Sequence, residues 1–141
     1  MIEAHGWLTL SYSDYDSEDE PQRQFITAFR NFMAQNYPWV LVDSYGRFIT
    51  RNGLECFAID ALHNHKGEPF YILEIFSWVA SNSTGSYGLL HLYDDEDAAH
   101  NNEFQVYIVK RGQLIKAQDA FLSPNFEEVE QEYDDANPPR D

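Results

Sequence analysis

Two groups of residues have the types and spacing that metal binding requires: the acidic run Asp94-Asp95-Glu96-Asp97 and the histidines His63 and His65. Two histidines two positions apart would share one face of a strand, and the carboxylates of this acidic run could supply oxygen ligands to a metal. The sequence contains neither the calcium-loop spacing of an EF-hand nor an HExxH zinc motif. We therefore favour solvated loop histidines. A small metal-dependent hydrolase built on His63, His65 and the acidic run is the alternative.

The sequence shows no activated nucleophile. Cys56 is the one cysteine, so no internal disulfide can form, and it lies in the apolar run Leu54 to Ala61 without a neighbouring base. We predict a buried structural cysteine. The GxSxG motif of serine hydrolases is absent, and Gly85-Ser86-Tyr87-Gly88 lacks the lysine of a phosphate-binding loop. We expect no catalytic residues, no metal and no cofactor.

The net charge excludes some classes of partner. The 141 residues carry 9 Lys and Arg against 24 Asp and Glu, a formal net charge of −15. Nucleic-acid phosphates and anionic membranes repel such a chain, which excludes a non-specific nucleic-acid binder and favours a partner with a basic surface. Most of the acids fall in residues 14–20, 94–97 and 127–135. The first stretch is typical of the start of a helix, and the last is typical of a mobile tail. The acidic run at residues 94–97 is the stretch that lies between two predicted strands.

The acidic run is therefore the predicted recognition surface, because a loop between two strands has the fixed geometry that recognition needs. Tyrosines beside a charged rim are common in protein interfaces. The predicted partner-binding residues are Asp94, Asp95, Glu96, Asp97 and Glu103, with Tyr87 or Tyr93 as aromatic anchors.

Hydrophobic periodicity and turn signals predict the elements that would position this surface. Helical spacing and start signals predict helices from Ser17 to Tyr37 and from Pro69 to Gly85. The expected strands cover residues 7–12, 39–42, 47–51, 54–62, 87–93, 104–109 and 114–117. The order β-α-β-β-β-α-β-β-β predicts an α+β fold, a mainly antiparallel sheet with two helices packed on one face. We expect a single domain over residues 1–124 and an acidic, mobile tail over residues 125–141.

Local signals add sharper predictions. Asn52-Gly53 predicts a hairpin turn, and Lys110 to Gln113 a second tight turn. Gly85 would end the second helix in the left-handed conformation, and Gly88 would let another backbone approach closely. Core packing is the favoured interpretation of the three tryptophans, Trp7, Trp39 and Trp78.

The N-terminal sequence has no basic region followed by an apolar stretch, so it shows no signal peptide. The longest apolar runs are far shorter than the roughly 20 residues that a membrane helix needs. Together with the lone cysteine, these features predict a cytoplasmic protein.

Several segments, taken in order, resemble one protein family. They are His5-Gly6-Trp7, Gly85-Ser86-Tyr87-Gly88-Leu89-Leu90, Asp94 to Asp97, Asn102-Glu103-Phe104 with Val106, Arg111-Gly112-Gln113-Leu114 and Phe121-Leu122-Ser123-Pro124. From Met1 to about Pro124 the chain resembles the immunity protein 7 family of bacterial polymorphic toxin systems, most densely from Gly85 onward.

This resemblance implies a function that composition does not provide. Immunity proteins of this kind are cytoplasmic, are not enzymes, and bind a cognate toxin domain to protect the producing cell. Because such toxins are often nucleases with basic clefts that hold phosphates, the resemblance suggests that the acidic run occupies such a cleft as a phosphate mimic. A general protein-binding adaptor domain, with no toxin involved, is a further alternative.

Overall fold

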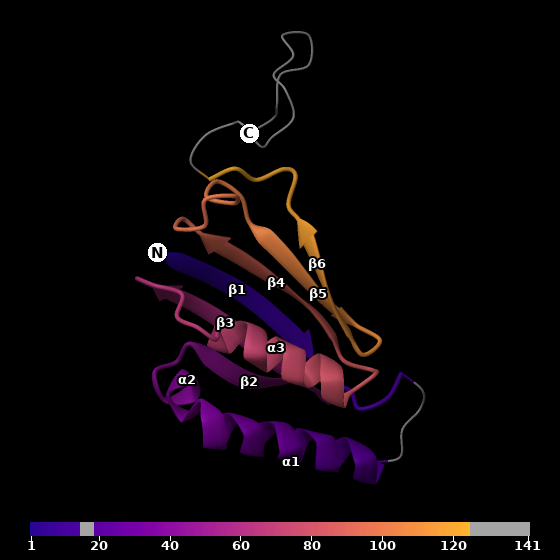
Figure 1. Ribbon diagram of the computed structural model, residues 1–141. Coiled ribbons are helices and arrows are strands. Elements are labelled where there is room, and N and C mark those ends of the chain that lie inside the picture. Colours follow the sequence, from indigo (N-terminus) through magenta and orange to yellow (C-terminus); the bar gives the residue numbers. More distant parts are fainter. Residues whose placement is uncertain (15–18, 125–141) are drawn as a thin grey trace.

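The computed structural model describes residues 1–14 and 19–124, which form a six-stranded sheet with all helices on one side (Figure 1). The strands are β1 (Ile2–Thr9), β2 (Gly46–Arg51), β3 (Leu54–His63), β4 (Tyr87–Asp94), β5 (Gln105–Lys110) and β6 (Gln113–Gln118). The helices are α1 (Asp19–Asn36), α2 (Pro38–Val42) and α3 (Tyr71–Asn82). The strand order is β2-β3-β1-β4-β5-β6, and every pairing is antiparallel.

The predicted fold class is confirmed, because an antiparallel sheet packs one face against the two long helices. Alternate residues of β1 point into this layer, and the helices contribute side chains at a spacing of three or four. The core side chains from these three elements are Ile2, Ala4 and Leu8, then Phe25, Phe29 and Met33, then Ile72, Ile75, Phe76 and Val79. Among the described helices, none combines the length and hydrophobicity needed to cross a bilayer.

The predicted strand over residues 39–42 is wrong, because this segment is the short helix α2. Pro38 occupies an early helical position, where its missing N–H costs nothing, and the Asp43 N–H donates to the Trp39 carbonyl oxygen at 2.8 Å. An apolar run without alternation does not distinguish strand from helix. Val40 is buried while Val42 is 79% exposed, as expected for one turn of helix resting on the core.

Both predicted tight turns are confirmed. Asn52 and Gly53 have φ values of 50° and 79°, and Arg111 and Gly112 have 50° and 76°. Two successive residues at positive φ form a turn whose twist matches that of the two strands it joins in a two-residue hairpin. These turns fix the registers of β2 with β3 and of β5 with β6.

Another segment of backbone lies close to both Gly88 and Gly85, so neither position has room for a side chain. A Cβ on Gly88 would lie 2.0 Å from the Trp7 carbonyl oxygen, which confirms the prediction for this residue. The prediction for Gly85 is wrong in its reason: α3 ends at Asn82, and the following Ser83 is extended with φ −152°. A Cβ on Gly85 would instead lie 2.2 Å from the Ser13 carbonyl oxygen.

No helix in residues 1–14 and 19–124 covers the other side of the sheet, which we call the open face. It consists of the outward-pointing strand residues, among them Trp7, Ile49, Cys56, Leu89 and Ile108. Core packing was the wrong prediction for Trp7, which is 44% exposed there. Cys56 is only half-buried, because it too lies on this face.

The other two tryptophans differ from each other. Trp78 stacks on Phe29 and Phe32 between α1 and α3, with ring centroids 5.5 and 5.0 Å away, so it packs against the core as predicted. Trp39 on α2 is 38% exposed. The predicted helix cap Ser17 and the predicted tail over residues 125–141 lie outside the described residues.

Candidate functional site

The acidic run begins at the last residue of β4 and continues into the loop that leads to β5. Asp94 is buried, and its Oδ1 accepts the backbone N–H of Glu96 at 3.0 Å. Asp97 accepts the N–H of Ala99 at 3.0 Å, and this hydrogen bond is the main reason that the pKa of Asp97 is lowered from its ordinary value. The hydrogen bonds of Asp94 and Asp97 therefore stabilise the conformation of this loop.

The two middle carboxylates face outward and contact groups from distant parts of the chain. Asp95 lies 2.8 Å from the Met1 ammonium, and Glu96 lies 2.9 Å from Nδ1 of His65. The side chains of Asp95 and Glu96 remain 39% and 53% exposed. These contacts gather the start of β1, the loop after β3 and the acidic run at one end of the sheet.

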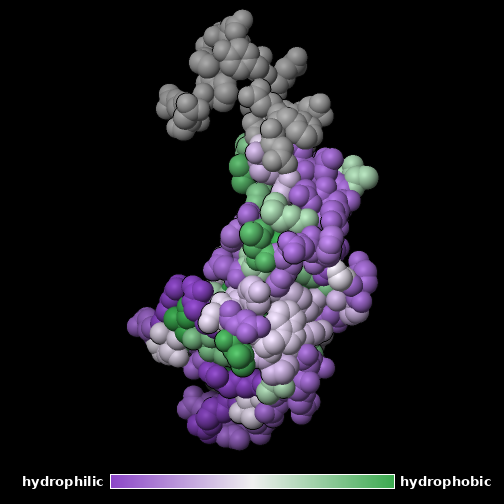
Figure 2. Space-filling view, turned by 90° about the vertical axis from the view of Figure 1, so that its left-hand side faces the viewer, coloured by the Kyte–Doolittle hydropathy of each residue, from purple (hydrophilic) through white to green (hydrophobic). Residues whose placement is uncertain are grey.

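This end of the molecule is polar at its surface. Figure 2 shows the side at which the N-terminus and α2 lie in Figure 1, where hydrophilic residues dominate and hydrophobic residues form separate small patches. A polar surface with projecting carboxylates suits reversible binding of a charged partner more than insertion into an apolar site.

Glu103 and Tyr93, two further predicted binding residues, lie beneath the loop. Both are 4% exposed. The Glu103 carboxylate contacts His100 and Gln118, and the Tyr93 hydroxyl donates to the Asn101 carbonyl oxygen at 3.0 Å. Both side chains hold the loop from inside in this structure, and their contact with a partner stays a prediction.

Tyr87, the other predicted anchor, lies at the far end of β4 from the acidic run. At a rise of about 3.3 Å per residue, the seven steps to Asp94 span roughly 23 Å. Tyr87 is 49% exposed on the open face and packs edge-to-face against Trp7. The structure therefore brings the acidic run, Tyr93 and Glu103 together and separates Tyr87 from them.

The two histidines considered for a metal site have different partners. Nε2 of His63 lies 2.6 Å from the Tyr71 hydroxyl, and burial raises the pKa of Tyr71 well above its ordinary value. His65 contacts Glu96 instead. Within residues 1–14 and 19–124, no group of three or more His, Cys, Asp or Glu side chains is placed to hold a metal. The metal-dependent hydrolase thus lacks a ligand set in the described part of the chain.

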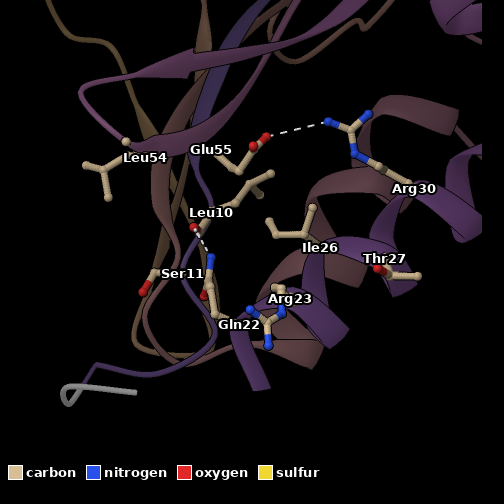
Figure 3. Close-up of a pocket in the computed structure, with 10 residues that line it drawn as sticks. Leu10, Ser11, Gln22, Arg23, Ile26, Thr27, Arg30, Leu54 and Glu55 are labelled. Carbon is tan, nitrogen blue, oxygen red and sulfur yellow. Dashed lines mark hydrogen bonds and ion pairs between the residues drawn. The ribbon is translucent and has the colours of Figure 1, made fainter. Parts of the chain in front are cut away.

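A hollow of about 480 Å³ lies between α1 and the turn that joins β2 to β3 (Figure 3). Leu10 and Ile26 form its apolar wall. The amide of Gln22 donates to the Leu10 carbonyl oxygen at 3.1 Å, and Arg30 lies 3.5 Å from Glu55. These two contacts link α1 to the segment after β1 and to β3, and none of the predicted site residues lines the hollow.

Sequence reasoning missed Trp7 as a surface residue, although the pattern of β1 contains the signal. Ile2, Ala4 and Leu8 share one parity and are buried, whereas Glu3, His5 and Trp7 share the other. Strand alternation therefore places Trp7 with two polar residues.

A known protein family matches nearly the whole chain. The family described as Immunity protein 7 matches residues 1–131. No curated protein and no solved structure gives a significant match to the chain.

Proposed function

The chain belongs to the immunity protein 7 family, and from this premise we propose that it binds its cognate toxin through the exposed carboxylates of the acidic run. Membership implies that the protein neutralises a toxin by binding it and that it is not an enzyme. Our proposal adds the surface, the charge of the partner and the compartment: the acidic run meets a basic surface of the toxin in the cytoplasm of the producing cell.

One observation carries this proposal: the Glu96 carboxylate already contacts a nitrogen of another segment, Nδ1 of His65, at 2.9 Å. Asp95 does the same with the Met1 ammonium. Both carboxylates remain partly exposed at the surface. Arginine or lysine side chains of a partner would find two projecting carboxylates there, and charge-assisted hydrogen bonds of this type are about twice as strong as neutral ones.

The fixed shape of the run supports the same proposal. Asp94 and Asp97 satisfy backbone N–H groups within the loop, and Glu103 and Tyr93 support it from below. A surface ordered before binding loses less conformational entropy in the complex. The net charge of −15 adds long-range attraction to any basic partner, which speeds association.

The proposed toxin is a nuclease whose cleft holds phosphates. A phosphate-binding cleft presents cationic side chains at short spacing, and neighbouring carboxylates can replace the phosphate oxygens as acceptors. In this arrangement the acidic run would compete directly with the nucleic acid.

The test is a binding measurement with the toxin domain encoded beside this protein, by calorimetry and by a viability assay. The double variant Asp95→Asn/Glu96→Gln removes two charges and keeps the hydrogen bonds of Asp94 and Asp97. We expect affinity to fall at least tenfold, which corresponds to about 1.4 kcal/mol, mainly through slower association at low salt. Reversing the charge of all four residues should abolish protection.

The matched control is Asp43→Asn/Glu74→Gln, which removes the same charge from exposed positions on other elements. It should leave affinity within about twofold, since only the general attraction of the net charge changes. Unchanged affinity and protection in Asp95→Lys/Glu96→Lys would refute the acidic run as the binding surface, while binding by the parent protein would still support toxin neutralisation.

A further inference from the structure

A row of apolar side chains crosses the open face from strand to strand. Pairing registers place the members of this row side by side: Ala58, Trp7, Leu89, Ile108 and Ile115, on β3, β1, β4, β5 and β6. Arg47 on the edge strand β2 lies beside Ala58, just outside the apolar row, and pairs with Asp60 at 3.6 Å. The uncovered face of an antiparallel sheet is normally polar, so an apolar row of this length indicates a covered surface.

The apolar surface extends beyond the row on the side of Tyr87. Trp7, Tyr87 and Leu54 are 44%, 49% and 50% exposed, and the rings of Trp7 and Tyr87 pack edge-to-face with centroids 6.1 Å apart. A hollow of about 510 Å³ beside Trp7 is lined in part by Ile49 and Leu54. Large aromatic side chains next to a hollow are typical of residues that contribute most to binding in protein interfaces.

Charges on the open face are arranged in opposite signs on the two sides of the row. The cations Arg51 and Lys110 lie on the side of Tyr87, and neither forms an ion pair with the described residues. The carboxylates Glu3 and Asp60 lie on the other side. They share His5, at 3.1 and 2.9 Å, and Asp60 also lies 3.6 Å from Arg47; both carboxylate side chains remain partly exposed.

We infer that the open face binds a second copy of this chain, face to face, about a two-fold axis that follows the apolar row. Rotation about this axis exchanges the two sides of the row. The Arg51 and Lys110 side of one copy then meets the Glu3 and Asp60 side of the other, twice in each dimer. The apolar rows pack against each other at the centre, as inner faces do in a sandwich of two sheets.

Charge also argues for a second copy over a basic partner. Arg51 and Lys110 would repel a strongly basic surface, whereas Glu3 and Asp60 of a second copy offer carboxylates to them. The acidic run lies at one end of the strands and the row near their middle. The acidic side of the open face reaches the start of the acidic run, because Glu3 pairs with Tyr93, but the apolar row does not include the run, and this inference does not depend on the proposed function.

Analytical ultracentrifugation of the full chain over a range of concentrations tests the inference. We expect a reversible dimer whose dissociation constant rises at least tenfold in Trp7→Gln, a substitution at an exposed position. Val42→Gln on α2, where the side chain is 79% exposed, is the control and should dimerise like the parent. A parent protein that stays monomeric at about 100 µM, or a Trp7→Gln variant that dimerises normally, overturns the inference.

Paired charge reversals test the direction of the axis. Arg51→Glu/Lys110→Glu and Glu3→Lys/Asp60→Lys should each dimerise at least tenfold more weakly alone, with the fold of each checked by circular dichroism. A mixture of the two should restore association, because each side of one variant then meets the opposite charge on the other. If the mixture associates no better than its components, the proposed arrangement is wrong. Loss of toxin binding in Trp7→Gln with no change in oligomeric state would instead assign this face to the toxin.

Discussion

Nδ1 of His65 lies 2.9 Å from Oε1 of Glu96, so the loop after β3 is joined to the acidic run across 31 positions of sequence. Both side chains are largely exposed, and an exposed pair of this type contributes between zero and about 1 kcal/mol to global stability. Its effect should therefore be local: it restrains two loops that the sheet alone does not connect.

We predict that His65→Ala speeds backbone hydrogen exchange in residues 95–97 several-fold while the free energy of unfolding falls by less than about 1 kcal/mol. Hydrogen exchange with mass spectrometry and urea denaturation measure the two quantities. Exchange in the hairpin turn at Asn52 and Gly53, at the other end of the sheet, provides the internal control. Equal exchange rates in the variant and the parent over residues 95–97 would show that this contact does not restrain the run.

The second prediction concerns the pH dependence that Asp97 contributes. The Ala99 N–H lowers the pKa of this carboxyl from its ordinary value of 3.8. A carboxyl with a lowered pKa in the folded state stabilises the protein above its ordinary pKa, and this stabilisation is lost as the pH falls through the folded-state value. Asp97→Asn should lower the unfolding midpoint at pH 7 by roughly 2 °C and should have a smaller effect below pH 3.8.

Thermal unfolding from pH 7 to pH 2.5 measures this effect, and Asp43→Asn on the C-terminal side of α2 is the control for removal of one surface charge. A difference between Asp97→Asn and the parent that grows as the pH falls would have the wrong sign for a stabilising carboxylate.

The fold class and the hairpins were predictable because their signals are local. Asn52-Gly53 and Arg111-Gly112 each place a glycine at a positive φ value, which glycine adopts readily, and alternation separates the two faces of β1. The segment Trp39 to Val42 carries no such signal. Its apolar residues fit either a strand or a helix, and the contact of Val40 with the core decides between them.

The candidate site was predictable only in part, because burial depends on contacts between distant segments. Asp95 and Glu96 are exposed, as expected for residues in a loop between two strands. Tyr93 and Glu103 are buried under that loop, and the sequence does not reveal the path of the loop. The strand order places β1 between β3 and β4, which creates the apolar row that includes Trp7. Only long-range pairing produces that row, so no local pattern could have indicated it.

The third prediction concerns His5 on the open face. The hydrogen bond to Asp60 and then the contact with Glu3 raise the pKa of His5 from its ordinary value of 6.5, against an opposing effect of burial. Asp60→Asn should return the His5 pKa toward 6.5, and Glu3→Gln should do so to a smaller extent. A raised histidine pKa stabilises the fold at pH values below 6.5, and this contribution disappears as the pH rises through the folded-state value.

Titration of the His5 ring protons by NMR measures this pKa in each variant. Asp43→Asn serves as the control, since it removes a carboxylate next to α2 on the other side of the sheet. A His5 pKa that does not move in Asp60→Asn would contradict the assignment of Asp60 as the main cause.

The last prediction compares two glycines whose substitution fails for different reasons. A Cβ at Gly88 would lie 2.0 Å from the Trp7 carbonyl oxygen, and backbone atoms of a central strand cannot move aside without separating β4 from β1. We expect Gly88→Ala to cost about 3 kcal/mol or more in the free energy of unfolding. A Cβ at Gly53 would meet no atom within 4 Å, but the φ of this residue is +79°, so Gly53→Ala should cost only about 1 kcal/mol, from backbone strain. Urea denaturation of both variants measures the difference, and similar losses at the two positions would show that the contact between Gly88 and Trp7 is looser than the structure indicates.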